Sequence, residues 1–199
     1  MVVVSRYNVG VDESDILKNK LGITDQNELV DAETILLRDT YDHFLKLLYD
    51  GELNVDLDLL FEIHKYFLGT LYSWAGKIRN VDMSKNFALF APAKYIKNSL
   101  KEFKADFEKN KPSSLDTVGE VAKKLAFIHC ELNIIHPFRD GNGRTNRLFL
   151  DLLVVEAGYQ LVDFTKISKS RYINACRFGM VKDYSKMEKI ILKLLKKEE

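Results

Sequence analysis

Residues 136–147 carry side chains that could act together on a phosphate group. The segment reads His-Pro-Phe-Arg-Asp-Gly-Asn-Gly-Arg-Thr-Asn-Arg. Its histidine can take up a proton near neutral pH. Its carboxylate can hold a cation, and its arginines present planar guanidinium groups that suit phosphate. This set of residue types in one short segment predicts a site that moves a phosphate-containing group.

The middle of this segment is suited to binding an anion through its backbone. Gly141 and Gly143 have no Cβ, so the chain can turn tightly and approach a ligand closely. With Asn142 between them, their successive N–H groups can form an anion-binding nest, and a following helix adds partial positive charge. Arg144 and Arg147 lie three residues apart on that helix, so both can reach the same anion.

Asp140 directly precedes the nest, where a carboxylate alone would repel phosphate. A divalent cation between the two removes this conflict, and Mg²⁺ is commonly held by one or two carboxylates together with phosphates. The alternative is that Asp140 caps the following helix, which is a common use of aspartate. With His136 as the base, the segment predicts metal-assisted phosphate transfer.

Two helices are expected to hold the segment, one over residues 118–132 and one over 148–156. Pro137 disfavours helical dihedrals at His136, so the first helix should end there. The second helix is apolar almost all round, which is typical of a buried central helix. The reactive segment is therefore predicted to be a loop on a rigid support, with its second half opening the second helix.

The remaining pattern predicts an all-α chain with one weak hairpin over residues 81–90. The helix before the reactive segment is expected to start at Leu115 or Asp116, with Val118 already facing the core. The Lys-rich end is expected to be solvated and frayed. Other helices are expected over residues 25–49, 57–71, 93–108, 168–177 and 185–197.

The composition fits one globular domain, or at most two small ones. The chain has 199 residues, of which 46% are hydrophobic, and we expect a single domain over 1–199 with a core over 19–195 and an N-terminal arm over 1–18. The formal net charge of +1 gives no reason to expect a nucleic-acid or membrane partner. Two cysteines and no signal peptide favour the reducing cytoplasm.

The reactive segment resembles the signature of the Fic family, His-x-Phe-x-Asp/Glu-Gly-Asn-Gly-Arg-x-x-Arg, at every fixed position. Residues 19–25 resemble the entry to a Fic core. Residues 72–79 resemble its Trp-Ala-Gly-x-x-Arg segment, and residues 90–92 the end of its target-docking hairpin. The resemblance runs from about 19 to 195. It implies the Fic fold, a compact bundle of about six to eight helices with a small β-hairpin flap.

The resemblance also implies an activity, because Fic proteins with Gly-Asn-Gly-Arg mostly transfer AMP from ATP to a Tyr, Thr or Ser hydroxyl of a target protein. By this analogy His136 is the general base, and Asp140 holds Mg²⁺ across the α- and β-phosphates. The Asn142 side chain assists the backbone cradle. The nucleotide- and phosphate-binding residues are then Gly141, Asn142, Gly143, Arg144 and Arg147.

In Fic proteins the hairpin is a flap that pairs with an extended segment of the target. Such strand addition gives affinity through main-chain hydrogen bonds without demanding much sequence. The alternative is a structural loop over the core. The residues of the predicted docking flap are Lys85, Asn86, Phe87, Ala88, Leu89 and Phe90.

Many Fic enzymes are inhibited by a helix with Ser/Thr-x-x-x-Glu-Gly/Asn, whose glutamate pairs with the second motif arginine, here Arg147. This chain has no full match. The inhibitor is then absent, diverged, or a separate antitoxin-like protein, and we favour the separate protein. His43, His64 and His129 are expected to be packed or surface residues.

Two other functions remain open. One is transfer of another group, such as UMP, phosphocholine or phosphate, although the kinase-like branch departs from the Gly-Asn-Gly-Arg found here. The other is a non-catalytic nucleotide-binding module, against which an intact His136 and Asp140 argue, because a pure binder needs neither base nor metal ligand.

Overall fold

The computed structural model describes residues 16–85 and 88–197, while residues 1–15, 86–87 and 198–199 lie outside the described part. The described residues form seven α-helices, two short 3-10 helices and one two-stranded hairpin, so the expected all-α fold is confirmed. The helices are α1 Gln26–Tyr49, α2 Leu59–Leu68, α3 Ile96–Asn110, α4 Val118–Ile135, α5 Asn142–Glu156, α6 Lys169–Gly179 and α7 Ser185–Leu194. The short elements are β1 Ser84–Lys85, β2 Ala88–Leu89, η2 Ala93–Tyr95 and η3 Phe164–Lys166.

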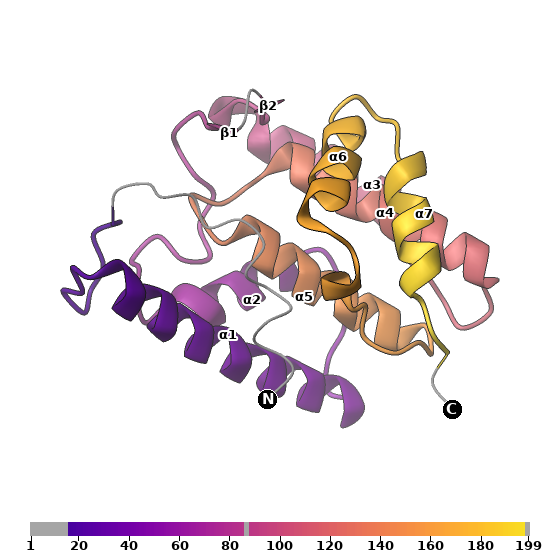
Figure 1. The fold of residues 1–199 in the computed structure, drawn as a ribbon, viewed down its shortest axis with the longest axis horizontal. Helices are drawn as coiled ribbons and strands as arrows, with labels where there is room; N and C mark the ends of the chain where they lie inside the picture. The colour runs from indigo at the N-terminus through magenta and orange to yellow at the C-terminus, as the bar shows by residue number, and fades with distance from the viewer. Residues whose placement is uncertain (1–15, 86–87, 198–199) are drawn as a thin grey trace.

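Helix α5 is the central element. It packs against α1, α2 and α4, and α3, α6 and α7 each pack against α4 (Figure 1). Its apolar side chains are buried all round, as the sequence predicts; Leu148, Phe149, Leu150, Leu152, Leu153 and Val154 have no exposed surface. Burial on every side holds the body of α5 rigidly, and the reactive loop leads directly into its first turn.

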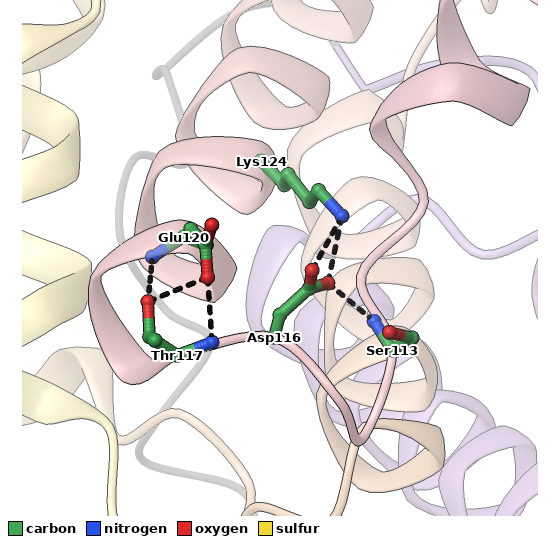
Figure 2. Close-up of polar contacts among 5 residues, drawn as sticks. All are labelled: Ser113, Asp116, Thr117, Glu120 and Lys124. Atoms are coloured by element: carbon green, nitrogen blue, oxygen red, sulfur yellow. Dashed lines mark hydrogen bonds and ion pairs between the residues drawn. The ribbon is translucent and has the colours of Figure 1, made fainter.

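Helix α4 starts later than expected, at Val118 rather than at Leu115 or Asp116. Thr117 is the N-cap, and its side chain and that of Glu120 satisfy each other's backbone amides in a capping box. Asp116 lies outside the helix, where it pairs with Lys124 at 2.7 Å (Figure 2). Val118, in the first turn, is 42% exposed, so the predicted core face begins only at Val121.

Two other predicted helices are shorter in the structure. Helix α2 covers Leu59–Leu68 rather than 57–71; Asp58 is its N-cap, and the Asp56 carboxylate accepts the amide of Leu59 at 3.1 Å. Helix α7 ends at Leu194 rather than at 197. Beyond it the backbone of Lys197 forms an isolated antiparallel bridge with Tyr159, so the predicted fraying is wrong up to residue 197.

The start of the described chain is packed rather than free. Ile16 and Leu17, within the predicted arm, lie partly buried against the core. Lys20 donates its backbone amide to the carbonyl of Leu71 at 2.7 Å, which ties this segment to the end of the α2 region. Across residues 16–85 and 88–197, no helix combines the length and apolar character that a membrane crossing requires.

Candidate active site

The reactive loop begins where α4 ends. His136 is the C-cap of α4, and its amide donates to the carbonyl of Leu132 at 2.9 Å. The helix therefore stops where Pro137 predicts. His136 adopts φ 47° and ψ 63°, which is the left-handed region, whereas a residue before proline usually becomes extended. This unusual backbone turns the chain sharply towards α5.

Asn142 fixes the shape of the loop. Its Oδ1 accepts the amide of Phe138 at 2.8 Å, and its Nδ2 donates to the carbonyl of Phe138 at 2.7 Å. Both polar atoms of this buried side chain are thus engaged within the loop. The side chain shapes the loop instead of reaching out to a phosphate, which differs from the expected assisting contact.

Gly141 is the N-cap of α5 and has φ 75°, which favours glycine. A Cβ there would lie 2.7 Å from Cδ1 of Leu68, so the position also lacks space for a side chain. The first amides of a helix have no partners within it, and Gly141 offers no side chain to cap them. The start of α5 can therefore receive an anion, as predicted for the nest of residues 141–143.

Arg144 is held on the side of α1 and α2. Its Nη1 pairs with the carboxylate of Glu33, and its guanidinium lies 5.0 Å from the ring centroid of Phe67. Its Nη2 is 3.6 Å from Oδ2 of Asp140. Glu33 also accepts the hydroxyl of Tyr72 at 2.9 Å. This network fixes Arg144 beside the start of α5.

Glu33 was missed as a site residue, although the sequence carries a signal for it. It occupies a core-facing position of α1 in the same stripe as Leu29 and Leu37, which are both buried. A charged residue is almost never fully buried unless it is paired, so a carboxylate in an apolar stripe indicates a partner elsewhere in the fold.

Arg147 is buried, with 3% of its surface exposed, and its side chain faces η3 and α6, whereas that of Arg144 faces α1 and α2. It borders a small pocket together with Tyr172 of α6 and Phe164 of η3. Its Nη1 would be 3.4 Å from a Cβ at Gly143, so its guanidinium reaches back over the first turn of α5. The two predicted arginines therefore lie beside the nest with different neighbours: α1 and α2 surround Arg144, and η3 and α6 surround Arg147.

His64 is buried and supports the loop, which agrees with its expected packed role. The amide of Gly76 donates to its Nδ1 at 2.8 Å, so the ring proton is on Nε2, which donates to the carbonyl of Asp140 at 2.9 Å. The ring is stacked on Phe138 with centroids 3.7 Å apart. Burial lowers the pKa of His64 to about 4, so the ring stays neutral.

The hairpin lies against the reactive loop. Strands β1 and β2 pair antiparallel, with Ser84 opposite Leu89. The ring of Phe90, directly after β2, is stacked on His136 with centroids 3.6 Å apart. Leu89 is 79% exposed. Lys85 and Ala88 contribute backbone pairing, while the predicted docking residues Asn86 and Phe87 lie outside the described residues.

Asp140 is suitably placed for a cation at the mouth of the nest. Its side chain is 46% exposed, although Oδ1 also accepts the amide of Gly141 at 2.6 Å. In the part of the chain described, no group of three or more His, Cys, Asp or Glu side chains gathers as a metal cage. A cation here would take most of its ligands from phosphate oxygens and water, which is how Mg²⁺ usually binds.

The chain is similar in sequence and in fold to known proteins of one family. Residues 54–154 match the Fic/DOC family, and the chain belongs to it. The probable protein adenylyltransferase y4lH of Sinorhizobium fredii is 31% identical over 90% of this chain and 92% of its own length. The probable protein adenylyltransferase Fic of Escherichia coli is 30% identical over 91% of this chain and 88% of its own.

Solved structures of Fic-family proteins are also similar to this chain. BepC of Bartonella tribocorum, a VirB-translocated effector protein with bound AMPPNP, has a TM-score of 0.78 and 26% identity, covering 98% of this chain and 99% of its own. The N-terminal Fic domain of a Bep effector protein from Bartonella quintana, with bound ADP, has a TM-score of 0.79 and 25% identity, covering 98% and 97%. The Fic fold expected from the signature is therefore confirmed.

Proposed function

We propose that this chain, as a single Fic domain over residues 1–199, is a protein adenylyltransferase that moves AMP from ATP to a Tyr, Thr or Ser hydroxyl of a target protein. One observation carries the proposal: the imidazole of His136 lies under the flap at the loop that leads into the start of α5. Relatives 30–31% identical over most of the chain are named probable protein adenylyltransferases, which supports the same activity.

In the proposed reaction, His136 takes the proton of the target hydroxyl. The hydroxyl oxygen forms a bond to the α-phosphorus of ATP, while the bond from that phosphorus to the bridging oxygen of the β-phosphate breaks. AMP is then joined to the target, and pyrophosphate leaves. The protein contributes positioning and charge stabilisation, as is usual for phosphoryl chemistry.

The start of α5 supplies the proposed phosphate contacts. Backbone groups of Gly141, Asn142 and Gly143 cradle the phosphates, and Arg144 and Arg147 offset charge on the β- and γ-phosphates. Glu33 pairs with Nη1 of Arg144, while Nη2 of the same guanidinium faces Asp140 beside the nest. Asp140 would hold Mg²⁺, which neutralises phosphate charge when bound.

We also propose that the target docks on the hairpin flap. An extended segment of the target would add to the hairpin edge through main-chain hydrogen bonds, which brings its hydroxyl towards His136. The predicted docking residues are those over 85–90. The stacking of Phe90 on His136 supports this proposal, because it joins the end of the flap directly to the proposed base.

The test is transfer from ATP labelled at the α-phosphate, with Mg²⁺, into proteins of a cell lysate and into the chain itself. We expect a labelled protein band with the wild type and no label with His136→Ala. Transfer only from a different donor, such as UTP or a phosphocholine donor, would instead show that the chain transfers UMP or phosphocholine. Nucleotide binding without transfer from any donor would favour a non-catalytic module.

A separate antitoxin-like protein is part of the proposal, as is a cytoplasmic setting, where ATP is abundant and thiols remain reduced. In this proposal a carboxylate of the partner would pair with Arg147, which borders a small pocket with Phe164 and Tyr172. Adding the candidate partner to the labelled-ATP reaction should suppress transfer. Transfer that continues at saturating partner would count against this inhibitor.

A further inference from the structure

Arg79 is buried, with 4% of its surface exposed, although it lies outside the reactive loop. Its Nε donates to the carbonyl of His136 at 2.8 Å. Its Nη1 and Nη2 donate at 2.6 Å to the carbonyls of Val81 and Ala91, respectively. Burying a charge is costly unless it is well hydrogen-bonded, and here carbonyls from three separate segments satisfy the guanidinium.

Two of these carbonyls belong to the two ends of the flap. Val81 precedes β1, and Ala91 follows β2. The same base is closed by a hydrogen bond from the amide of Phe90 to the carbonyl of Met83 at 3.3 Å. The amide of Ala91 also donates to the carbonyl of Ile134 at 3.0 Å, in the last turn of α4. The flap base is therefore fastened both to itself and to α4.

The third carbonyl belongs to His136, whose left-handed backbone is unfavourable for a residue with a Cβ by about 1–2 kcal/mol. The amide of Arg79 donates to the next carbonyl, that of Pro137, at 2.8 Å. The imidazole itself is stacked on Phe90, beside Ala91. The backbone and the ring of His136 are thus both held from the flap side.

We infer that Arg79 is a positioning residue for AMP transfer. Its guanidinium joins both ends of the flap to the carbonyl of His136, so that a target segment docked on the flap has a fixed position relative to the imidazole. The inference rests on the proposed function, which makes His136 the base and the flap the docking strand. Arg79 acts through His136 and through the flap base.

The first test compares Arg79→Met, which keeps the length of the side chain without its donors, with Lys77→Met. Lys77 is an exposed cation two residues earlier in the same segment. In the labelled-ATP reaction we expect the kcat of Arg79→Met to fall roughly 100-fold, because small misplacement of reacting groups has effects of this size. The KM for ATP should change less than about threefold, because α5 forms the nest. Arg79→Lys should recover part of the loss.

The second test is independent of transfer. The chain has four histidines, so their Cε1–H signals can be assigned by NMR through single substitutions. In Arg79→Met the signal of His136 should shift, because its stacking on Phe90 changes, while that of His43, which stacks on Tyr66, should stay. Isothermal titration with AMPPNP and Mg²⁺ should give nearly the wild-type affinity.

An unchanged His136 signal in Arg79→Met would overturn the inference, as would a loss of kcat matched by an equal loss in Lys77→Met. If Arg79→Met fails to fold, Arg79→Lys perturbs the same junction more mildly, and the same two outcomes decide. A wild-type protein that transfers no AMP would overturn the proposed function, while the NMR comparison would still decide whether Arg79 positions His136.

Discussion

His129 lies inside the molecule, directly behind the turn of α5 that carries Arg147. Its Nδ1 is 3.2 Å from Nδ2 of Asn146, and its Nε2 is 3.1 Å from the hydroxyl of Tyr172. Burial, and then the charge of Arg147, lowers the pKa of His129 to about 3. The neutral imidazole allows a buried cation to lie beside it at pH 7.

This environment predicts a pH dependence of stability. The unfolded chain protonates His129 near pH 6.5 and the folded chain only near pH 3, so the free energy of unfolding should fall as the pH falls between these values. The contribution approaches about 1.4 kcal/mol per pH unit. His129→Gln should be less stable than the wild type at neutral pH, with a gap that narrows towards acid. Urea unfolding at several pH values measures this gap, and a constant gap would refute the prediction.

Gly141 offers a second test at the level of the residue. Gly141→Ala should lower the free energy of unfolding by about 2 kcal/mol, because the left-handed backbone disfavours a Cβ and Leu68 must move. It should also weaken AMPPNP binding. Gly119→Ala is the matched control, since this helical glycine has open space around its Cβ position and should gain about 0.5–1 kcal/mol. Equal melting temperatures for the two variants would contradict the assigned role of Gly141.

The reactive residues were predictable because they lie together in one segment. Their supports were not, because the hydrogen bonds that define them join positions far apart in sequence. Arg144 and Glu33 are 111 positions apart, and the His64 ring and the Asp140 carbonyl are 76 apart. The role of Arg79 could not be predicted, because its three acceptors are backbone carbonyls and the side-chain sequence gives no information about them.

In helix α4, the residues that stabilise the helix start and the residue proposed to act as the base lie at opposite ends. Its N-terminus carries the capping box of Thr117 and Glu120 (Figure 2), and its C-terminus carries His136. With 18 residues at 1.5 Å each, these ends are about 27 Å apart. A change at the cap should therefore act on folding and leave the reactive loop intact.

Thr117→Ala should lower the free energy of unfolding by about 1 kcal/mol, because an amide at the helix start loses its acceptor. The affinity for AMPPNP and the kcat should stay within about twofold of wild type. Denaturant unfolding and calorimetric titration measure the two effects. Ser114→Ala, an exposed serine just before the cap, serves as the control. A Thr117→Ala protein with normal stability would contradict the capping role.

Helix positions were predictable to within a few residues, and the errors have local causes. Apolar periodicity located α4 and a nearly continuous apolar run located α5, whereas the first turn of α4 depends on its cap. Asp116 looks like an N-cap in sequence, yet its carboxylate is engaged by Lys124 and by the amide of Ser113, which leaves Thr117 to start the helix. Competition between two neighbouring capping residues is decided by such contacts.

For the molecule as a whole, nucleotide binding should be measurable as stability. A ligand at one hundred times its Kd adds about 2.7 kcal/mol to the free energy of unfolding, which for a chain of this size raises Tm by about 5–10 °C. We expect AMPPNP with Mg²⁺ to raise the Tm of the wild type and of His136→Ala equally, because the imidazole acts on the target. Arg147→Ala should show a much smaller shift. A loss of the shift in His136→Ala would mean that this residue binds nucleotide.

The left-handed backbone at position 136 favours glycine, whereas the proposed reaction requires a histidine there. The proposed base occupies a position whose conformation glycine would adopt more readily, so the backbone there favours a residue that cannot react. Once the ring is lost, His136→Gly should be more stable than His136→Ala by about 1 kcal/mol, the reverse of their usual order in helices. Thermal unfolding of the two variants tests this. Relaxed selection would then drive position 136 towards glycine, and a family member with glycine there would be a candidate for lost activity with a retained fold.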